Sequence, residues 1–200
     1  MDLEERLGTV RARMRGLGSV LVAFSGGADS ALVLALAHEV LGDRAAGAIG
    51  LSAAYPQTEV DSARATAAHI GTRLLETPTA QLEDPAFLRN DGTRCYRCRD
   101  DLYAILRPLA AHHGFAAICD GTNADDLGDH RPGQRATREA GVTSPLAVAG
   151  MTKAEVLSRA GSPRHSFRKS RVWVYSATDN WIVELNFSGE RVIGINWSRP

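Results

Sequence analysis

The sequence predicts an α/β fold: a doubly wound parallel sheet followed by a small β-rich appendage. Short apolar runs alternate with helix-like segments over residues 1–160, a pattern typical of parallel sheets. The first apolar run, residues 20–24, passes through a Ser/Gly turn directly into a second apolar segment of helical composition. Beyond residue 160 the pattern changes to short β-branched and aromatic runs separated by turn residues.

Each element follows from local spacing. Apolar residues recur from Leu3 to Leu17 at helical intervals and predict an amino-terminal helix. Predicted strands, each short and largely apolar, follow at residues 20–24, 45–52, 74–76 and 116–119. The predicted helices between and after them lie at residues 31–37, 58–70, 80–88 and 95–113. Pro108 is expected to interrupt the last helix, and residues 143–146 are predicted to be a short extended piece.

The carboxyl end is predicted to form a separate unit. Thr152 and Glu155 have the spacing of a capping box, which predicts one more short helix that Gly161 stops. About three strands are then expected, at residues 172–175, 181–185 and 191–195. We therefore expect two domains, residues 1–160 and residues 161–200. So small a meander is hardly stable alone, and we expect it to pack on the first domain or on another subunit of a homo-oligomer.

Composition narrows the classes of function. The formal net charge of the 200 residues is zero, which favours neither nucleic-acid nor membrane binding. Three cysteines, an odd number, argue against a disulfide framework and for a reducing compartment. No apolar run reaches the roughly 20 residues that cross a bilayer. We expect a cytoplasmic protein without a signal peptide.

The turn after the first strand is predicted to bind a polyphosphate. Backbone N–H groups and the positive end of the helix dipole converge where a strand enters a helix. Gly26 and Gly27 let an anion approach the backbone, Ser25 and Ser30 add hydroxyl donors, and Asp29 can hold Mg²⁺ on a phosphate. The Gly-Lys-Ser/Thr ending of a Walker A loop is missing. An ordinary glycine-rich turn is the alternative.

The motif Ser-Gly-Gly-x-Asp-Ser resembles the loop of the N-type ATP pyrophosphatases, the PP-loop superfamily. This resemblance implies an adenine nucleotide alpha hydrolase-like fold. It also implies cleavage of ATP between the α and β phosphates, adenylation of a substrate and release of pyrophosphate. The nucleotide is expected against the end of the strand, the turn and the neighbouring strand ends, that is, against Ala23, Phe24, Ser25, Gly26, Gly27, Asp29, Ser30, Ser52 and Gly121.

A pair of cysteines begins the predicted helix at residues 95–113. If the helix includes Cys95 and Cys98, both thiols lie on one face, and the helix terminus with Arg94, Arg97 and Arg99 lowers their pKa. Thiolates are nucleophiles and ligands of iron–sulfur clusters or zinc. A closed zinc site of four protein sulfurs is excluded by the cysteine count. Two incidental thiols remain the alternative.

A dense polar loop follows the strand at residues 116–119. The loop, residues 120–133, lies at the ligand-binding edge of a parallel sheet, where polar residues are candidates for function. Its carboxylates, Asp126 among them, could bind Mg²⁺, and Arg131 could grip a phosphate or carboxylate. A solvated acidic loop is the alternative.

Together the three motifs resemble the ATP-dependent sacrificial sulfur transferases, LarE, over residues 17–160. The resemblance implies adenylation of a carboxylate of pyridinium-3,5-biscarboxylate mononucleotide, a step in building the nickel-pincer cofactor of lactate racemase. Sulfur then comes from a cysteine or from an iron–sulfur cluster held by three cysteines. By this resemblance Asp29, Cys95, Cys98 and Arg131 are the expected catalytic residues, with ATP and Mg²⁺ as cofactors. Asp29 and Asp126 would hold the metal, and Cys95 and Cys98 would supply sulfur or hold a cluster.

The chain departs from that family after residue 160. The family continues into a Pro-Ala-Ser-x-Cys segment, whereas this sequence reads Ser162-Pro163-Arg164-His165-Ser166 and has no cysteine after Cys119. Cys119 is expected to be a small buried core residue. Two other functions therefore stay open: an amidating or tRNA-thiolating PP-loop enzyme, and a non-catalytic nucleotide-binding module.

Overall fold

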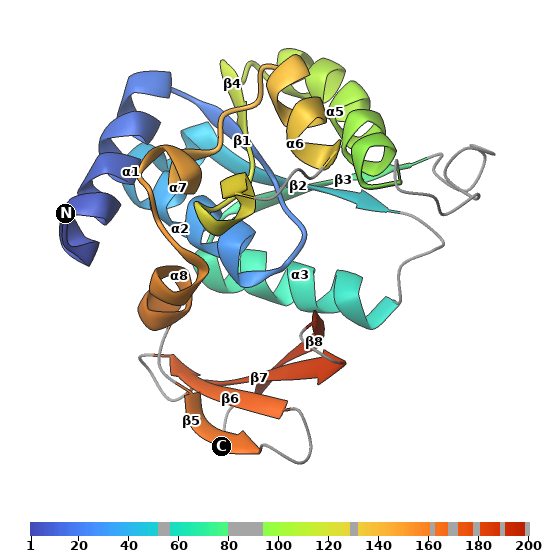
Figure 1. Ribbon diagram of the computed structural model, residues 1–200. Helices are drawn as coiled ribbons and strands as arrows, with labels where there is room; N and C mark the ends of the chain where they lie inside the picture. Colours follow the sequence, from blue (N-terminus) through green and yellow to red (C-terminus); the bar gives the residue numbers. More distant parts are fainter. Residues whose placement is uncertain are drawn as a thin grey trace.

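The computed structural model describes residues 1–51, 57–79, 94–128, 132–160, 163–167, 172–177, 181–188 and 191–198. A parallel four-stranded sheet with the order β3-β2-β1-β4 forms its centre (Figure 1). The strands are β1 (Val20–Ala23), β2 (Ala45–Leu51), β3 (Arg73–Pro78) and β4 (Ala117–Cys119). Val20 pairs with Ala45 on one side and with Ala117 on the other, so β1 is a central strand.

Helices cover both faces of this sheet. They are α1 (Leu3–Leu17), α2 (Ala28–Leu41), α3 (Gln57–Ile70), α5 (Arg94–His112), α6 (Pro132–Glu139), α7 (Pro145–Val148) and α8 (Lys153–Ala160), with 3-10 turns η1 (Gly42–Arg44) and η3 (Asp125–Gly128). Successive side chains of β1 point to opposite faces: Val20 and Val22 join the core under α1, α2 and α3, whereas Leu21 packs with Leu106 of α5. The predicted doubly wound α/β fold is confirmed.

The strand order reverses between β1 and β4, and this reversal determines where a ligand can bind. The connections through α2 and α3 run outward to β2 and β3, and the connection through α5 returns to β4 on the other side of β1. At such a switch point the loops after the two central strands diverge and leave a crevice at the carboxyl edge. The loops that follow Ala23 and Cys119 therefore border the same edge.

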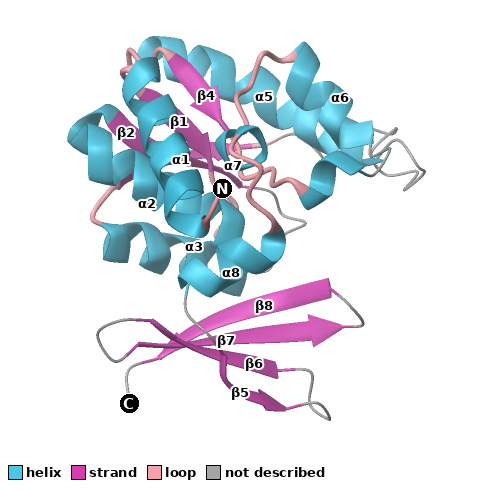
Figure 2. Ribbon diagram, turned by 60° about the vertical axis from the view of Figure 1, so that its left-hand side comes forward, coloured by secondary structure: helices cyan, strands magenta, loops and turns pink. Residues whose placement is uncertain are grey.

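A second sheet lies beyond the α/β part and consists of four antiparallel strands where about three were predicted. In the order in which they pair, the strands are β5 (Pro163–Phe167), β6 (Val172–Ala177), β7 (Trp181–Ser188) and β8 (Arg191–Ser198). Figures 1 and 2 show this sheet on the side of α3, with β8 the strand that contacts that helix. The division into two domains at residue 160 stays a prediction.

Three local predictions have different outcomes. The capping box is present: Thr152 donates its N–H to Glu155 Oε2 at 2.8 Å, and α8 starts at the next residue. α5 continues through Pro108, which was expected to interrupt it. Residues 143–146 are not one extended piece, because Thr143 bridges Cys119 but Pro145 begins α7, where its fixed φ suits a first helical turn. The predicted helix at residues 80–88 lies outside the described residues.

Candidate functional site

The loop between β1 and α2 has the shape that its two glycines allow. Gly26 has a φ of 77°, and a Cβ added there would lie 3.1 Å from Cβ of Ala63 in α3. Both facts favour glycine, because other residues rarely adopt this φ and the neighbouring helix leaves little room. Gly27 caps α2 in extended conformation and, as a glycine, supplies no side-chain cap. Among the described residues, no side chain accepts a hydrogen bond from the first-turn N–H groups of α2, which suits an anionic ligand.

The two serines of the loop have different roles. The Ser30 hydroxyl is buried and donates to the Gly27 carbonyl oxygen at 3.0 Å. It also accepts the Ser25 N–H at 3.3 Å and lies 3.2 Å from the Ser25 hydroxyl. Ser30, expected to donate to a ligand, thus stabilises the loop itself, whereas Ser25 is exposed. Of the two hydroxyls, the structure leaves Ser25 better placed for a ligand.

The loop after β4 packs directly on the amino end of α2. A Cβ on Gly121 would lie 2.7 Å from the Ser30 backbone nitrogen and 3.1 Å from the Asp29 carbonyl carbon. No side chain fits there, because both neighbours are backbone atoms that cannot turn away. Gly121 was predicted to bind the nucleotide, and the structure places it where the β1 and β4 loops meet.

Asp120, at the end of β4, organises a buried hydrogen-bond network. Its Oδ2 accepts the hydroxyls of Tyr103 at 2.9 Å and Thr122 at 2.8 Å, and its Oδ1 accepts the Thr122 N–H at 3.1 Å. Burial, and then the negative charge of Asp120, raise the pKa of Tyr103 well above its usual value. Tyr103 therefore stays protonated and donates to Asp120 throughout the neutral range. The sequence indicated Asp120 only as one carboxylate of the 120–133 loop and did not indicate this network.

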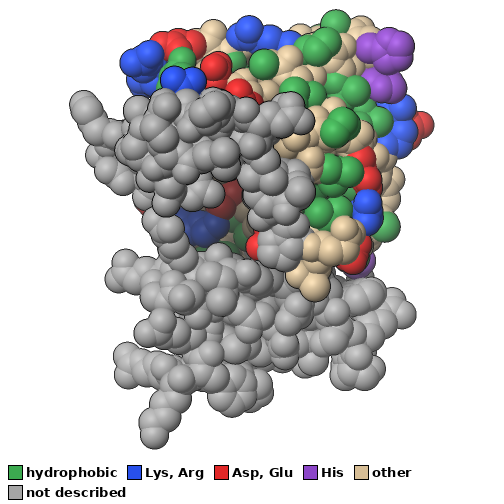
Figure 3. Space-filling view, turned by 90° about the vertical axis from the view of Figure 1, so that its right-hand side faces the viewer, with side chains coloured by type: hydrophobic (Ala, Val, Ile, Leu, Met, Phe, Trp, Pro, Cys, Tyr) green, Lys and Arg blue, Asp and Glu red, His purple; other side chains and the backbone are tan. Residues whose placement is uncertain are grey.

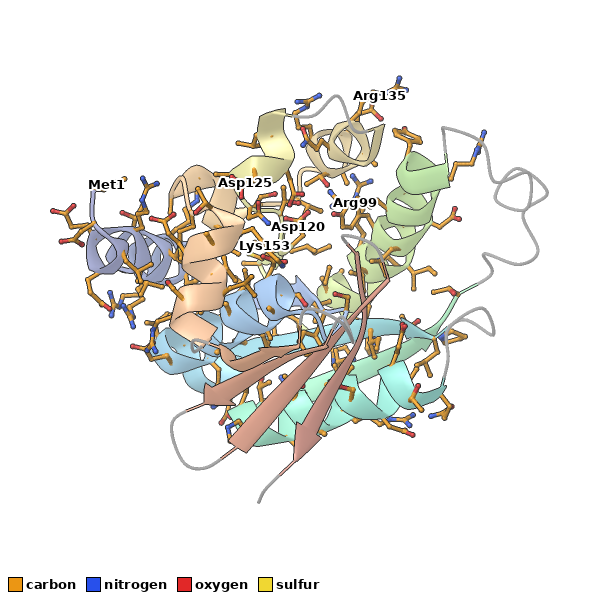
Figure 4. All side chains as sticks on the ribbon, turned by 60° about the horizontal axis from the view of Figure 1, so that its bottom comes forward. Met1, Arg99, Asp120, Asp125, Arg135 and Lys153 are labelled. Carbon is orange, nitrogen blue, oxygen red and sulfur yellow. The ribbon has the colours of Figure 1, made fainter. Side chains whose placement is uncertain are left out.

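Arg99 joins α5 to this network. Its Nη1 donates to Thr137 Oγ1 at 3.0 Å and to Thr122 Oγ1 at 3.3 Å, and lies 3.7 Å from Asp120 Oδ2. Figure 4 shows Arg99 and Asp120 on neighbouring elements. Because Arg99 lies one residue after Cys98, these contacts hold the start of α5 at the carboxyl edge of the sheet.

Asp29, in the first turn of α2, has two partners that the sequence did not suggest. Its Oδ2 forms an ion pair with Nζ of Lys153, and its Oδ1 accepts Nδ2 of Asn123 at 3.3 Å. Lys153 is the first residue of α8, and its backbone N–H donates to Asp125 Oδ2 at 2.8 Å. A signal for Lys153 was available: of 23 basic residues, only Lys153 and Lys169 are lysines, so arginine was not used here.

Two carboxylates were predicted to bind magnesium, those of Asp29 and Asp126. Asp126 Oδ2 accepts the Asn123 N–H at 3.1 Å and so helps to form the β4 loop. Among the described side chains, no three His, Cys, Asp or Glu residues are grouped to hold a metal. Magnesium typically binds one or two carboxylates plus substrate phosphates, and Asp29 beside the helix terminus fits that arrangement. An iron–sulfur site has no such support among these residues.

The remaining predicted residues fall into three groups. Ser52 and Arg131 lie outside the described residues, as do the side chains of Cys95 and Cys98, whose backbone lies in the first turns of α5. Phe24 is a core residue that is 3% exposed, so its side chain is not available to a ligand, while Ala23 ends β1. Cys119 is fully buried, and burial raises its pKa to about 12, so it supplies no thiolate at neutral pH.

The surface adds little that points to a macromolecular partner. On the described part of the face in Figure 3, basic and acidic side chains lie interspersed among hydrophobic and neutral ones. Neither sign of charge dominates there, in agreement with the neutral composition. No helix in the described part of the chain is long and apolar enough to cross a bilayer.

Comparisons with known proteins find relatives over most of the chain. The family described as asparagine synthase matches residues 3–127. An uncharacterized protein of Synechocystis is 38% identical over 154 residues, which are 77% of this chain and 58% of that protein. The pyridinium-3,5-bisthiocarboxylic acid mononucleotide synthase of Lactiplantibacillus plantarum is 36% identical over 155 residues, 77% of this chain and 56% of that protein. The chain thus spans less than two thirds of the length of these relatives.

Solved structures share the fold at low sequence identity. The glutamine-dependent NAD⁺ synthetase of Acinetobacter baumannii, in complex with ADP, has a TM-score of 0.62 at 19% identity and covers 79% of this chain and 31% of its own. The NH3-dependent NAD synthetase of Campylobacter jejuni has a TM-score of 0.51 at 18% identity, covering 64% of this chain and 59% of its own. These likenesses show the fold.

Proposed function

The chain belongs to the asparagine synthase family of PP-loop ATP pyrophosphatases, and on that premise we propose that it uses ATP to adenylate a substrate carboxylate and releases pyrophosphate. The proposal rests on one observation: the loops after β1 and β4 pack against each other at the edge where the strand order reverses. There an uncapped helix terminus, a glycine turn and the Asp29 carboxylate border the same edge.

The residues of the loop would act by holding and positioning charge. The N–H groups at the start of α2 and the exposed Ser25 hydroxyl would bind phosphate oxygens, and the buried Ser30 keeps the turn in the shape that presents them. Asp29 would hold Mg²⁺, which supplies positive charge to the leaving pyrophosphate. Holding the carboxylate in line with the α-phosphate would account for most of the rate gain.

We extend the proposal to sulfur transfer. The similar Lactiplantibacillus protein is named for a bisthiocarboxylic acid mononucleotide, a product in which sulfur has replaced carboxylate oxygen. In this chain Cys95 and Cys98 lie in the first turns of α5, which Arg99 ties to the β4 loop. We propose that the substrate is a pyridinium carboxylate mononucleotide and that a thiolate of this pair attacks its acyl-adenylate and displaces AMP. Loss of the cysteine Cα proton and cleavage of its Cβ–S bond then leave the sulfur on the substrate and dehydroalanine in the chain. The alternative is that the pair helps to hold a cluster that supplies the sulfur.

Pyrophosphate release tests the proposal. Purified protein would be incubated with ATP, Mg²⁺ and pyridinium-3,5-biscarboxylate mononucleotide, with nicotinate mononucleotide and free nicotinate as comparison carboxylates. We expect pyrophosphate release that depends on the dicarboxylate, with a matching amount of adenylyl group recovered as acyl-adenylate and as the AMP that sulfur or water displaces from it. Production of ADP and phosphate would contradict the proposal, as would pyrophosphate release that is independent of every carboxylate.

A further inference from the structure

The ion pair between Lys153 and Asp29 lies on the group that the proposed function needs for magnesium. Asp29 Oδ2 faces the ammonium group of Lys153, and the two side chains are 22% and 41% exposed. Both partners are therefore accessible to solvent and to ions. In this structure the carboxylate is neutralised by the protein's own cation.

The same lysine is also held by its backbone. Its N–H donates to Asp125 Oδ2 at 2.8 Å, and Asn123, two residues before Asp125, donates to Asp29 Oδ1 at 3.3 Å. A ring of contacts thus joins α2, α8 and the β4 loop through Asp29, Lys153, Asp125 and Asn123. Because Lys153 is the first residue of α8, a ligand that displaces its ammonium group from Asp29 Oδ2 removes a contact of the first turn of that helix.

We propose that Lys153 is a built-in counter-ion that competes with a divalent cation for Asp29. The inference deepens the proposed function and rests on it for the choice of ligand. A divalent cation bound at Oδ2 and an ammonium group within contact of the same oxygen repel each other, so one excludes the other. Arrival of a cation with its polyphosphate therefore releases Lys153 from α2 while Asp125 still holds its backbone. The start of α8 loosens when the site is loaded.

Mn²⁺ binding without nucleotide tests the competition. Free Mn²⁺ would be measured by electron paramagnetic resonance in titrations of wild type, Lys153→Met, Asp29→Asn and the double variant. Arg159→Met is the matched control, since it removes a positive charge from the same helix at an exposed position. We expect Lys153→Met to bind Mn²⁺ about fivefold more tightly than wild type, which is the order of an ion pair between partly exposed groups.

The other variants make the result specific. Arg159→Met should match wild type, and Asp29→Asn should remove the gain in the double variant. Equal Mn²⁺ affinity in wild type and Lys153→Met would overturn the inference. An equal gain in Arg159→Met would also overturn it, because the effect would then be one of net charge.

Amide hydrogen exchange gives a second readout on the wild-type protein. Addition of Mn²⁺ with a non-hydrolysable ATP analogue should speed exchange at residues 154–156, and the same addition to Lys153→Met should change it little. Unchanged or slower exchange in the wild type would contradict the release of α8. Neither readout uses turnover: competition without pyrophosphate release would retain this inference and reject the proposed function, and the reverse result would do the opposite.

Discussion

A Cβ on Gly121 would lie 2.7 Å from the backbone nitrogen of Ser30. This contact between the β4 loop and the first turn of α2 brings the two parts of the candidate site together. It also explains why the second residue of the loop after β4 has no side chain. The neighbouring atoms belong to the backbone, so a larger residue must displace one loop from the other.

Gly121→Ala is therefore expected to weaken both nucleotide binding and folding. Overpacking of this kind costs about 1–3 kcal/mol, which corresponds to a fall in Tm of several degrees. Calorimetry with ATP should show an affinity at least about tenfold lower, since about 1.4 kcal/mol corresponds to tenfold. Gly16→Ala is the control, because its Cβ would meet nothing within 4 Å. Wild-type affinity in Gly121→Ala would mean that the juncture is not part of the site.

Two tyrosines of α5 offer a matched test of the Asp120 network. Tyr103 is 2% exposed and donates to buried Asp120, whereas Tyr96 donates to exposed Glu139 at 2.6 Å. Tyr103→Phe removes a donor from a buried carboxylate and should lower the free energy of unfolding by about 1–3 kcal/mol. Tyr96→Phe should cause no measurable loss in the same urea titration. An unchanged free energy of unfolding in Tyr103→Phe would show that the contact with Asp120 adds no stability.

Alkaline pH should destabilise the protein through Cys119. Burial raises the pKa of this thiol to about 12 in the folded chain, against about 8.5 for an unfolded cysteine. The stability from the protonated thiol is complete below the unfolded pKa and is lost as pH rises toward the folded one. Between pH 7 and pH 10 the loss is about 2 kcal/mol. Cys119→Ala should therefore show a shallower decline in unfolding free energy over this range, and a parallel decline in both proteins would contradict the assignment.

The other two cysteines should behave differently from Cys119 in thiol labelling. We expect Cys95 and Cys98 to react in the native protein at pH 8, because helix amino termini and neighbouring arginines favour thiolates. Cys119 should react only after unfolding in urea. Mass spectrometry of the labelled peptides would settle the order of reaction. Protection of both Cys95 and Cys98 would remove them as sulfur donors, and anaerobic reconstitution would show whether they bind a coloured cluster.

Removal of residues 161–200 tests the two-domain prediction. β8 contacts α3, whereas Asp29, Gly121 and Lys153 all lie before residue 160. We expect the shortened chain to lose stability or to change its oligomeric state, as seen in sedimentation, while it still binds ATP. Loss of ATP binding by a shortened chain that keeps its circular dichroism spectrum would place the second sheet in the site.

The α/β fold could be predicted from the sequence because the local patterns of strands and helices agree with the order that a parallel sheet requires. Apolar runs such as residues 20–24 are too short for helices and are followed at once by caps and glycines, so strand and helix order could be inferred. The capping box at Thr152 was found for the same reason. Bounds differed where tertiary contacts decide, as at Pro145, which starts a helix instead of extending a strand.

The sequence predicted only part of the candidate site. The glycine turn predicts an anion site, because its residues are adjacent in the sequence. The partners of Asp29 are residues 123 and 153, which are far from it in the sequence, so no spacing rule predicts these contacts. Ser30 had the right chemistry for a ligand, yet its hydroxyl is used by the Gly27 carbonyl. Asp120 and Arg99 form their network only because β4 and α5 lie next to each other. Such long-range contacts follow from topology and not from sequence pattern.

Isotope transfer tests the central claim most directly. Pyridinium-3,5-biscarboxylate mononucleotide with ¹⁸O in its carboxylates would be incubated with the protein, ATP and Mg²⁺, and AMP and pyrophosphate would be analysed by mass spectrometry after sulfide is added. Attack of the carboxylate on the α-phosphate, followed by displacement by sulfur, leaves one carboxylate oxygen on AMP. The account predicts ¹⁸O in AMP and none in pyrophosphate. Unlabelled AMP, or ¹⁸O in inorganic phosphate with ADP as product, would contradict it.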